Sequence, residues 1–143
     1  FAGGILGGAP AVASLVLNGV NLGVIGSVLS ADPSTRTTFW SFVVTHSSFE
    51  ITGLILSGAA GLKLGYALLA PGRMPRKRSL AETGRHVLPL LAGAALLTLL
   101  AAFFEGFWSA QTVVPAWGKF VSGAVCWSLV ITYLLFAGRQ RGR

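Results

Sequence analysis

The side chains with the clearest chemical potential lie inside apolar stretches of this chain. His46 and Glu50 are four residues apart in THSSFE, and Glu105 lies in FFEGFW. Residues at i and i+4 share one face of an α-helix, so His46 and Glu50 should form a pair. An imidazole and two carboxylates could clamp helix ends through hydrogen bonds. They could also bind a ligand, lipid headgroup or partner, or, as a looser pattern, ligate a metal ion.

Catalytic signatures do not accompany these residues. General acid–base catalysis by the carboxylates is disfavoured because the sequence shows no nucleophile or oxyanion device beside them. It contains no Walker A loop and no GxSxG, HExxH or CxxC motif. The one cysteine, Cys126, lies in an apolar run and is expected to pack there. We therefore predict no enzymatic activity, no resident metal and no cofactor.

The composition indicates that membrane helices position these residues. Of 143 residues, 53% are hydrophobic and 10% are charged. Soluble domains carry about 25% charged residues and could not bury so much apolar surface in so small a core. The 19 glycines fit membrane helices, in which small residues let backbones approach closely. We predict an all-α fold, a multi-spanning transmembrane helix bundle.

Four segments are long enough to cross a bilayer, which takes roughly 20 apolar residues per helix. We place them at about 10–29, 39–70, 87–108 and 118–137, in a single transmembrane domain spanning 1–143. Pro10 predicts a helix break, because proline lacks a backbone donor. The preceding FAGGILGG is then either the tail of an earlier helix or the start of the first one. Because the chain opens on Phe1, we expect a fragment that lacks its N-terminal region.

Charge and tryptophan placement predict the topology. The net charge is +7, and segment 71–86 and the C-terminal tail hold most of the bases. The positive-inside rule puts both in the cytoplasm, so we expect no nucleic-acid partner. Trp40, Trp108 and Trp117 fall at the opposite boundary, as an interfacial belt would. The bases are Arg73, Arg76, Lys77, Arg78 and Arg85 in the segment, and Arg139, Arg141 and Arg143 in the tail.

Counting residues along two antiparallel helices brings the ionisable groups together. If Ala70 and Val87 are level, Glu50 lies 20 residues from one end and Glu105 lies 18 from the other. At about 1.5 Å per residue, the carboxylates differ in depth by roughly 3 Å. His46 lies about 6 Å further out on the same count. We predict that the three converge at the extracytoplasmic end of this helix pair.

Other polar residues in the apolar stretches have simpler expected roles. Lys63 lies near the inner end and should extend its ammonium to the interface. Asn18 and Asn21 share a helix face; they should hydrogen-bond another helix or, alternatively, line a polar cavity. A stripe of small residues favours close helix packing, at Ser57, Gly61 and Gly65. The candidate binding residues are His46, Glu50, Glu105, Asn18, Asn21 and Lys63.

Three segments resemble the stage II sporulation protein M family of multi-spanning membrane proteins: NGVNLG, FWSFVVTHSSFEITGLILSGAAGLKLGYALLAPGRMPRKRSL and GRHVLPLLAGAALLTLLAAFFEGFWSA. The likeness covers about 3–138. The family's His-Gly-x-x-Glu element matches His46 and Glu50, with Ser47 in place of the glycine, and its Glu-Gly-Phe element begins at Glu105. The family's small-residue stripe and Pro-Gly turn match Gly58, Gly61, Gly65, Pro71, Gly72 and Arg76.

The resemblance implies a non-enzymatic membrane scaffold in the plasma (inner) membrane of a prokaryote. In sporulating relatives such a protein organises peptidoglycan-remodelling hydrolases at the engulfing membrane. It implies contact with membrane lipid and with other membrane or extracytoplasmic proteins, and homo-oligomers are compatible with it. The alternative is a transport component that moves a lipid-linked or small polar solute past Asn18, Glu50 and Lys63.

Overall fold

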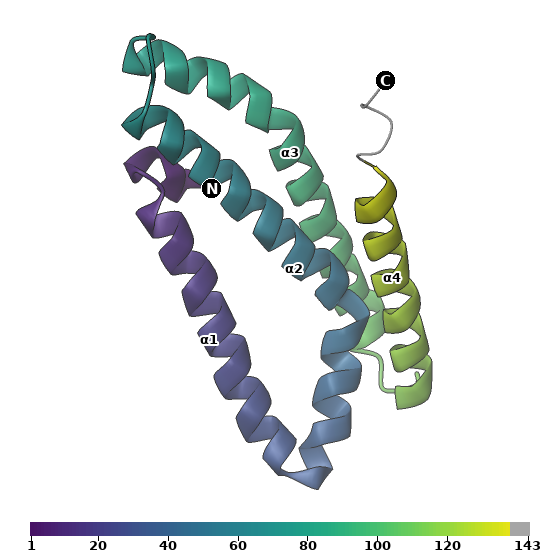
Figure 1. Ribbon diagram of the computed structural model, residues 1–143. Coiled ribbons are helices and arrows are strands. Elements are labelled where there is room, and N and C mark those ends of the chain that lie inside the picture. Colours follow the sequence, from purple (N-terminus) through teal and green to yellow (C-terminus); the bar gives the residue numbers. More distant parts are fainter. Residues whose placement is uncertain (138–143) are drawn as a thin grey trace. The chain divides into compact units, whose positions relative to one another are not determined.

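The described chain consists of helices and the short connections between them. The computed structural model describes residues 1–137, with the side chain of Ile5 excepted, and Figure 1 shows their order. Four helices are long and apolar enough to cross a membrane, which confirms the predicted all-α membrane fold. The basic tail at 138–143 lies outside the described residues. The elements are η1 (Ala2–Leu6), α1 (Ala9–Ala31), α2 (Pro33–Leu69), α3 (Arg76–Phe104), η2 (Glu105–Ser109) and α4 (Ala116–Phe136).

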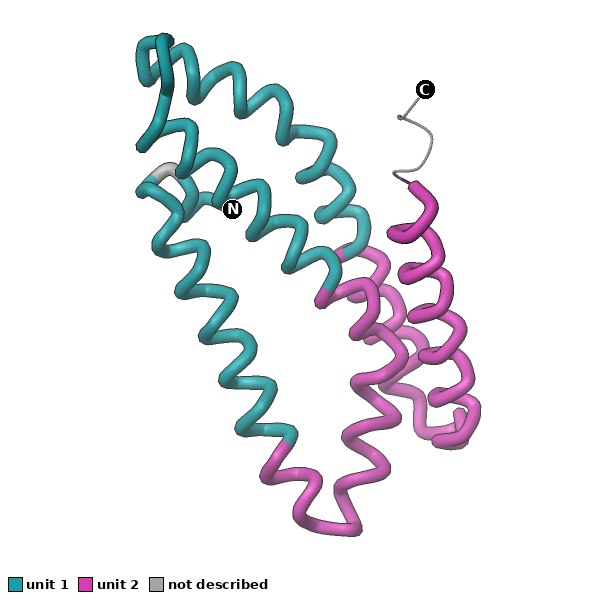
Figure 2. Tube along the Cα trace, viewed as in Figure 1, with its two compact units in different colours: residues 1–26, 52–97 teal, residues 27–51, 98–143 magenta. Residues whose placement is uncertain are grey.

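The chain divides into two compact units, which Figure 2 colours separately. Unit 1 contains Phe1–Gly26 and Thr52–Leu97, and unit 2 contains Ser27–Ile51 and the chain from Thr98 onwards. Unit 1 therefore holds most of α1, the C-terminal half of α2 and most of α3. Unit 2 holds the end of α1, the N-terminal half of α2, the end of α3, η2 and α4.

In unit 1, α2 and α3 share a small apolar core. Ala60 and Leu64 of α2 pack with Val87 of α3, and leucines of α3 cover them. The Ser79 hydroxyl donates a 3.0 Å hydrogen bond to the Ala67 carbonyl, which ties the two helices together beside the connecting turn. Gly72 in that turn has a φ of 62°, a conformation that favours glycine.

Glycines let η1 and the start of α1 pack directly on α2, still within unit 1. The break predicted near Pro10 lies at Gly7 and Gly8, whose φ angles are 80° and 87°. Pro10 is in the first turn of α1, where its missing N–H costs nothing. A Cβ built on Gly65 would lie 2.6 Å from the Gly8 nitrogen, so the predicted close packing along this stripe is confirmed.

The start of α2 differs from the sequence expectation of about residue 39. The helix begins at Pro33, because Asp32 caps it: the Asp32 Oδ1 accepts a 2.8 Å hydrogen bond from the Ser34 N–H. Aspartate at the N-cap and proline at the first helical position are both favoured. These bonds from Ser34 hold the pKa of the exposed Asp32 carboxyl below its ordinary value.

The expected basic loop at 71–86 is also corrected. Helix α3 begins at Arg76, so only the residues before it form the connection. The Pro75 carbonyl accepts hydrogen bonds from the Arg78 and Ser79 N–H groups, which starts the first turn. Low hydropathy correctly marked where the apolar span stops, but arginine, lysine, leucine and alanine are good helix formers, so the helix extends into polar sequence. Helices α1 and α4 begin and end within two residues of their predicted bounds.

Candidate functional site

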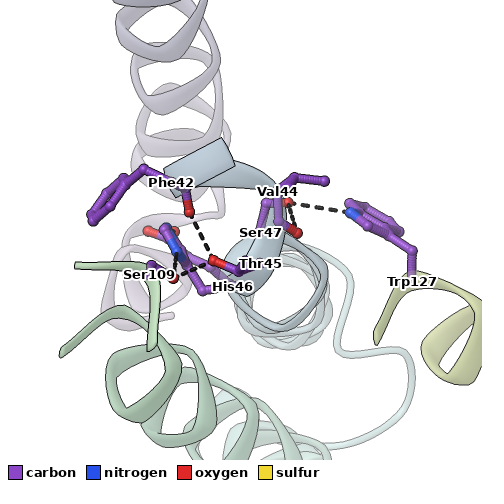
Figure 3. Close-up of polar contacts among 8 residues, drawn as sticks. Phe42, Val44, Thr45, His46, Ser47, Ser109 and Trp127 are labelled. Atoms are coloured by element: carbon purple, nitrogen blue, oxygen red, sulfur yellow. Dashed lines mark hydrogen bonds and ion pairs between the residues drawn. The ribbon is translucent and has the colours of Figure 1, made fainter. Parts of the chain in front are cut away.

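Polar side chains from α2, η2 and α4 meet at Ser109 in unit 2. The Ser109 hydroxyl shares a hydrogen bond with the Thr45 hydroxyl and lies 3.2 Å from the His46 Nδ1 (Figure 3). The Lys119 ammonium donates a 2.7 Å hydrogen bond to the Ser109 carbonyl. We call Thr45, His46, Ser109 and Lys119 the Ser109 cluster.

The Ser109 cluster is buried. Thr45 is 0% exposed, Ser109 is 1% exposed, and His46 and Lys119 are 5% and 9% exposed. Burying polar groups is costly unless they are hydrogen-bonded, and here Ser109 supplies the partners for all three of the others. One serine therefore joins three helical elements. Loss of its hydroxyl would leave buried groups on α2 without that partner.

Ser109 ends a π-helical turn. In η2 the Ala110 N–H donates to the Glu105 carbonyl at 3.1 Å, a hydrogen bond that spans five residues. Such turns widen a helix locally and are often found at functional sites. The sequence EGFWS contains no pattern that predicts a π turn. Ser109 was therefore not predicted as a site residue, although it lies four residues beyond Glu105.

His46 also lies beside Glu50, as the i, i+4 spacing predicts. The His46 Nε2 and the Glu50 Oε2 are 3.7 Å apart, and the Glu50 side chain is 60% exposed. The contact becomes an ion pair when the imidazole is protonated. The imidazole also meets the Phe42 ring in an edge-to-face arrangement, with centroids 5.1 Å apart. His46 thus connects a buried hydroxyl cluster to an exposed carboxylate.

Glu105 does not complete the three-residue convergence that the depth count predicts. The predicted similarity in depth of Glu50 and Glu105 agrees with the structure. The residues just before them, Phe49 and Phe104, have ring centroids 5.5 Å apart. The Glu105 side chain, however, is exposed, and within residues 1–137 its carboxylate has no hydrogen bond or ion pair. A hydroxyl is cheaper to bury than a carboxylate, so Ser109 occupies the position beside His46. Among the described residues no three His, Cys, Asp or Glu side chains are grouped to hold a metal ion.

The remaining predicted site residues, Asn18, Asn21 and Lys63, belong to unit 1 and are exposed. The Asn18 amide donates to the Ser14 carbonyl of its own helix at 2.8 Å. The side chains of Asn21 and Lys63 have no hydrogen bond or ion pair within the described part of the chain. The structure does not bring these three together, and their binding roles stay predictions, as do those of His46, Glu50 and Glu105.

A second contact in unit 2 holds α4 against α2. The Trp127 Nε1 donates a 3.2 Å hydrogen bond to the hydroxyl of Ser47, which is itself buried (Figure 3). A Cβ built on Gly123 would lie 2.7 Å from the Val44 carbonyl oxygen, so the two backbones approach closely there. No role was predicted for Trp127, because in the sequence a tryptophan within an apolar segment does not differ from its apolar neighbours.

Comparison with known proteins identifies the family to which the chain belongs. Residues 1–110, more than three quarters of the chain, match the family described as stage II sporulation protein M. The chain belongs to this family. The resemblance seen in the sequence extends to residue 138, but α4 lies beyond the matched residues. With its four candidate spans, the chain is a multi-pass membrane protein of the stage II sporulation protein M family.

One curated relative is an uncharacterized protein of Methanocaldococcus jannaschii. It is 32% identical over 108 residues, which cover 73% of this chain and 60% of the relative. The matched region thus spans less than two thirds of that protein's length. No solved structure matches the chain.

Proposed function

We propose that this protein is a non-enzymatic membrane scaffold that holds partner proteins through helix–helix contacts in the bilayer. The observation that carries the proposal is Asn21. It lies near the middle of α1, is exposed, and its amide has no hydrogen bond among residues 1–137. Backbone and side-chain polar groups facing lipid are expensive, because the bilayer core offers no water as a partner. A partner helix that pairs with Asn21 removes this cost.

Helix α1 as a whole has little covered surface. In its most apolar stretch 6% of the residues are buried, against 44% for α2. Ser14, Asn18 and Asn21 are spaced by four and three residues, so they form one polar stripe along α1. Hydrogen bonds between membrane helices contribute about 0.6 to 2 kcal/mol each, enough to select a partner but not to bind one tightly alone. The expected occupant is the transmembrane helix of another protein that carries hydrogen-bonding side chains.

Family membership supports this class of function. The resemblance implies a scaffold, which in sporulating relatives organises peptidoglycan-remodelling hydrolases. For this chain we propose the plasma membrane of a prokaryote, with the C-terminus and the start of α3 in the cytoplasm. Arg76, Lys77 and Arg78 in the first turn of α3 then face anionic lipid headgroups. The partner class is membrane or extracytoplasmic proteins.

Affinity purification in a mild detergent tests the proposal. The wild-type protein should retain one or more proteins in fixed stoichiometry, and Asn21→Leu should lose them while still folding. Val16→Leu is the matched control, because it changes an exposed residue at a different position on the same helix. If Asn21→Leu retains the same proteins, the scaffold role of α1 is wrong. Solute flux through proteoliposomes containing this protein alone would instead support transport.

A further inference from the structure

A cavity of about 540 Å³ lies in unit 2 next to the Ser109 cluster. It is formed by the last turn of α1, the first turns of α2, the connection after η2 and the start of α4. Its lining residues are Leu29, Ser34, Thr35, Thr38, Phe39, Phe42, Ser109, Ala110, Thr112 and Lys119. The lining thus combines polar side chains with aromatic and aliphatic ones.

Among the described residues, Lys119 is the only charged side chain in this lining, and it is more than nine-tenths buried. An ammonium has three donors, and within the described residues Lys119 uses one, to the Ser109 carbonyl. No carboxylate of residues 1–137 forms an ion pair with it. A buried charge without a counter-charge is strongly unfavourable. The lining therefore presents a desolvated cation with two unused donors.

Two hydroxyls in the lining are also free to donate. Among the described residues, the side chains of Thr38 and Thr112 have no hydrogen-bond partner, whereas the Thr35 hydroxyl is bonded to the Leu29 carbonyl at 2.7 Å. The N-terminus of α2 adds no donors. Its Ser34 N–H is bonded to the Asp32 carboxylate, and the next two N–H groups are bonded to the Asp32 carbonyl. The donors available to a ligand are therefore Lys119, Thr38 and Thr112.

We propose that this cavity binds a phosphate group. A phosphate offers negative charge and at least two strong acceptor oxygens, which match one ammonium and two hydroxyls. Lysine binds phosphate as a point charge and tolerates varied geometry. The apolar walls formed by Leu29, Phe39 and Phe42 suit an attached acyl chain, so the same chemistry fits a phospholipid headgroup or a free phosphate. The site is separate from the partner contact proposed for Asn21 and does not depend on it.

Two probes distinguish the sources of phosphate. Native mass spectrometry of the purified protein, titrated with phosphatidylglycerol or phosphatidylcholine, measures headgroup binding. Titration with inorganic phosphate in lipid-free neutral detergent, followed by thermal shift, measures free phosphate. Binding of phosphatidylglycerol with no response to inorganic phosphate assigns the site to a lipid, and a saturable response to inorganic phosphate assigns it to the free ion.

Variants test whether Lys119 is responsible for binding the phosphate group. Lys119→Gln should weaken binding of whichever probe binds by about tenfold or more, as expected for loss of a charge-assisted contact. Arg85→Gln is the matched control, because it removes one positive charge from an exposed residue of unit 1 and should leave binding within about twofold. The double variant Thr38→Val, Thr112→Val changes two exposed side chains and should also weaken binding.

Three results would overturn the proposal: neither probe binds the wild type, Lys119→Gln binds like the wild type, or Arg85→Gln loses binding equally. If Lys119→Gln does not fold, the threonine double variant decides, because both of its substitutions change exposed side chains of the lining. Unchanged binding in that variant would equally contradict the assignment.

Discussion

Substituting Gly65 by alanine should weaken unit 1, because there is no room for a methyl group between α2 and the start of the chain. The new Cβ would lie 2.6 Å from the Gly8 nitrogen, 2.7 Å from the Gly7 carbonyl carbon and 2.9 Å from the Gly8 Cα. All three atoms are backbone, so no side chain can rotate away.

The expected loss of stability in Gly65→Ala is the difference between two opposing contributions. Overpacking a closely packed site costs about 1 to 3 kcal/mol. Replacing glycine by alanine within a helix recovers about 1 kcal/mol. The net loss should be about 1 kcal/mol or somewhat more, which lowers the folded-to-unfolded ratio by about fivefold.

Gly93→Ala in α3 is the matched control. A Cβ at Gly93 would meet no atom within 4 Å, so only the gain in helix propensity remains. Unfolding of both variants in mixed micelles with increasing denaturing detergent measures the difference, which should be about 2 kcal/mol. If Gly65→Ala is as stable as Gly93→Ala, η1 and α1 do not pack on α2 as described.

Three further changes test unit 2. Ser109→Ala should destabilise the protein by about 1 to 3 kcal/mol in the same unfolding assay, since it leaves the buried His46 Nδ1 without its hydrogen-bond partner and removes the bond between Thr45 and η2. Glu105→Ala should change stability by less than about 0.5 kcal/mol, and equal effects would contradict the Ser109 cluster. Trp127→Phe should lower the free energy of unfolding by about 0.5 to 1.5 kcal/mol, because the hydrogen bond to Ser47 is lost. Combining it with Ser47→Ala should lower this free energy little further, and fully additive losses would refute the contact. Because the pKa of Asp32 is lowered in the folded state, its ionised carboxylate stabilises the fold at pH values above the ordinary aspartate pKa. This stabilisation disappears as the pH falls through the lowered pKa of the folded state. Asp32→Asn, which keeps the cap, should therefore flatten the fall in melting temperature below about pH 4, and an unchanged pH profile would contradict this cause.

Sequence patterns predicted the spans well because hydropathy and span length are summed over many residues. Helix ends were less predictable, as at Pro33 and Arg76, because local capping and helix propensity extend helices beyond the apolar stretch. The pairing of His46 with Glu50 follows from helix geometry and is confirmed.

The partner of His46 across the helix pair could not be predicted. Residue counting gave the depth but not the rotation of each helix, and η2 alters the rotation near Glu105. Ser109 and Thr45 are ordinary hydroxyl residues whose role depends on tertiary contact alone. In the sequence, Lys119 is an isolated base at the edge of an apolar segment. Its burial without a carboxylate partner among the described residues is the most informative feature of unit 2.

Site-specific photo-crosslinking in living cells tests the scaffold claim most directly. A photo-reactive residue at position 25, one turn beyond Asn21 on the polar side of α1, should form a crosslink to a specific protein, and Asn21→Leu should abolish it. The same residue at position 16, equally exposed on another side of α1, should give only lipid adducts. Lipid adducts alone from position 25, or the same protein adduct from both positions, would contradict the account.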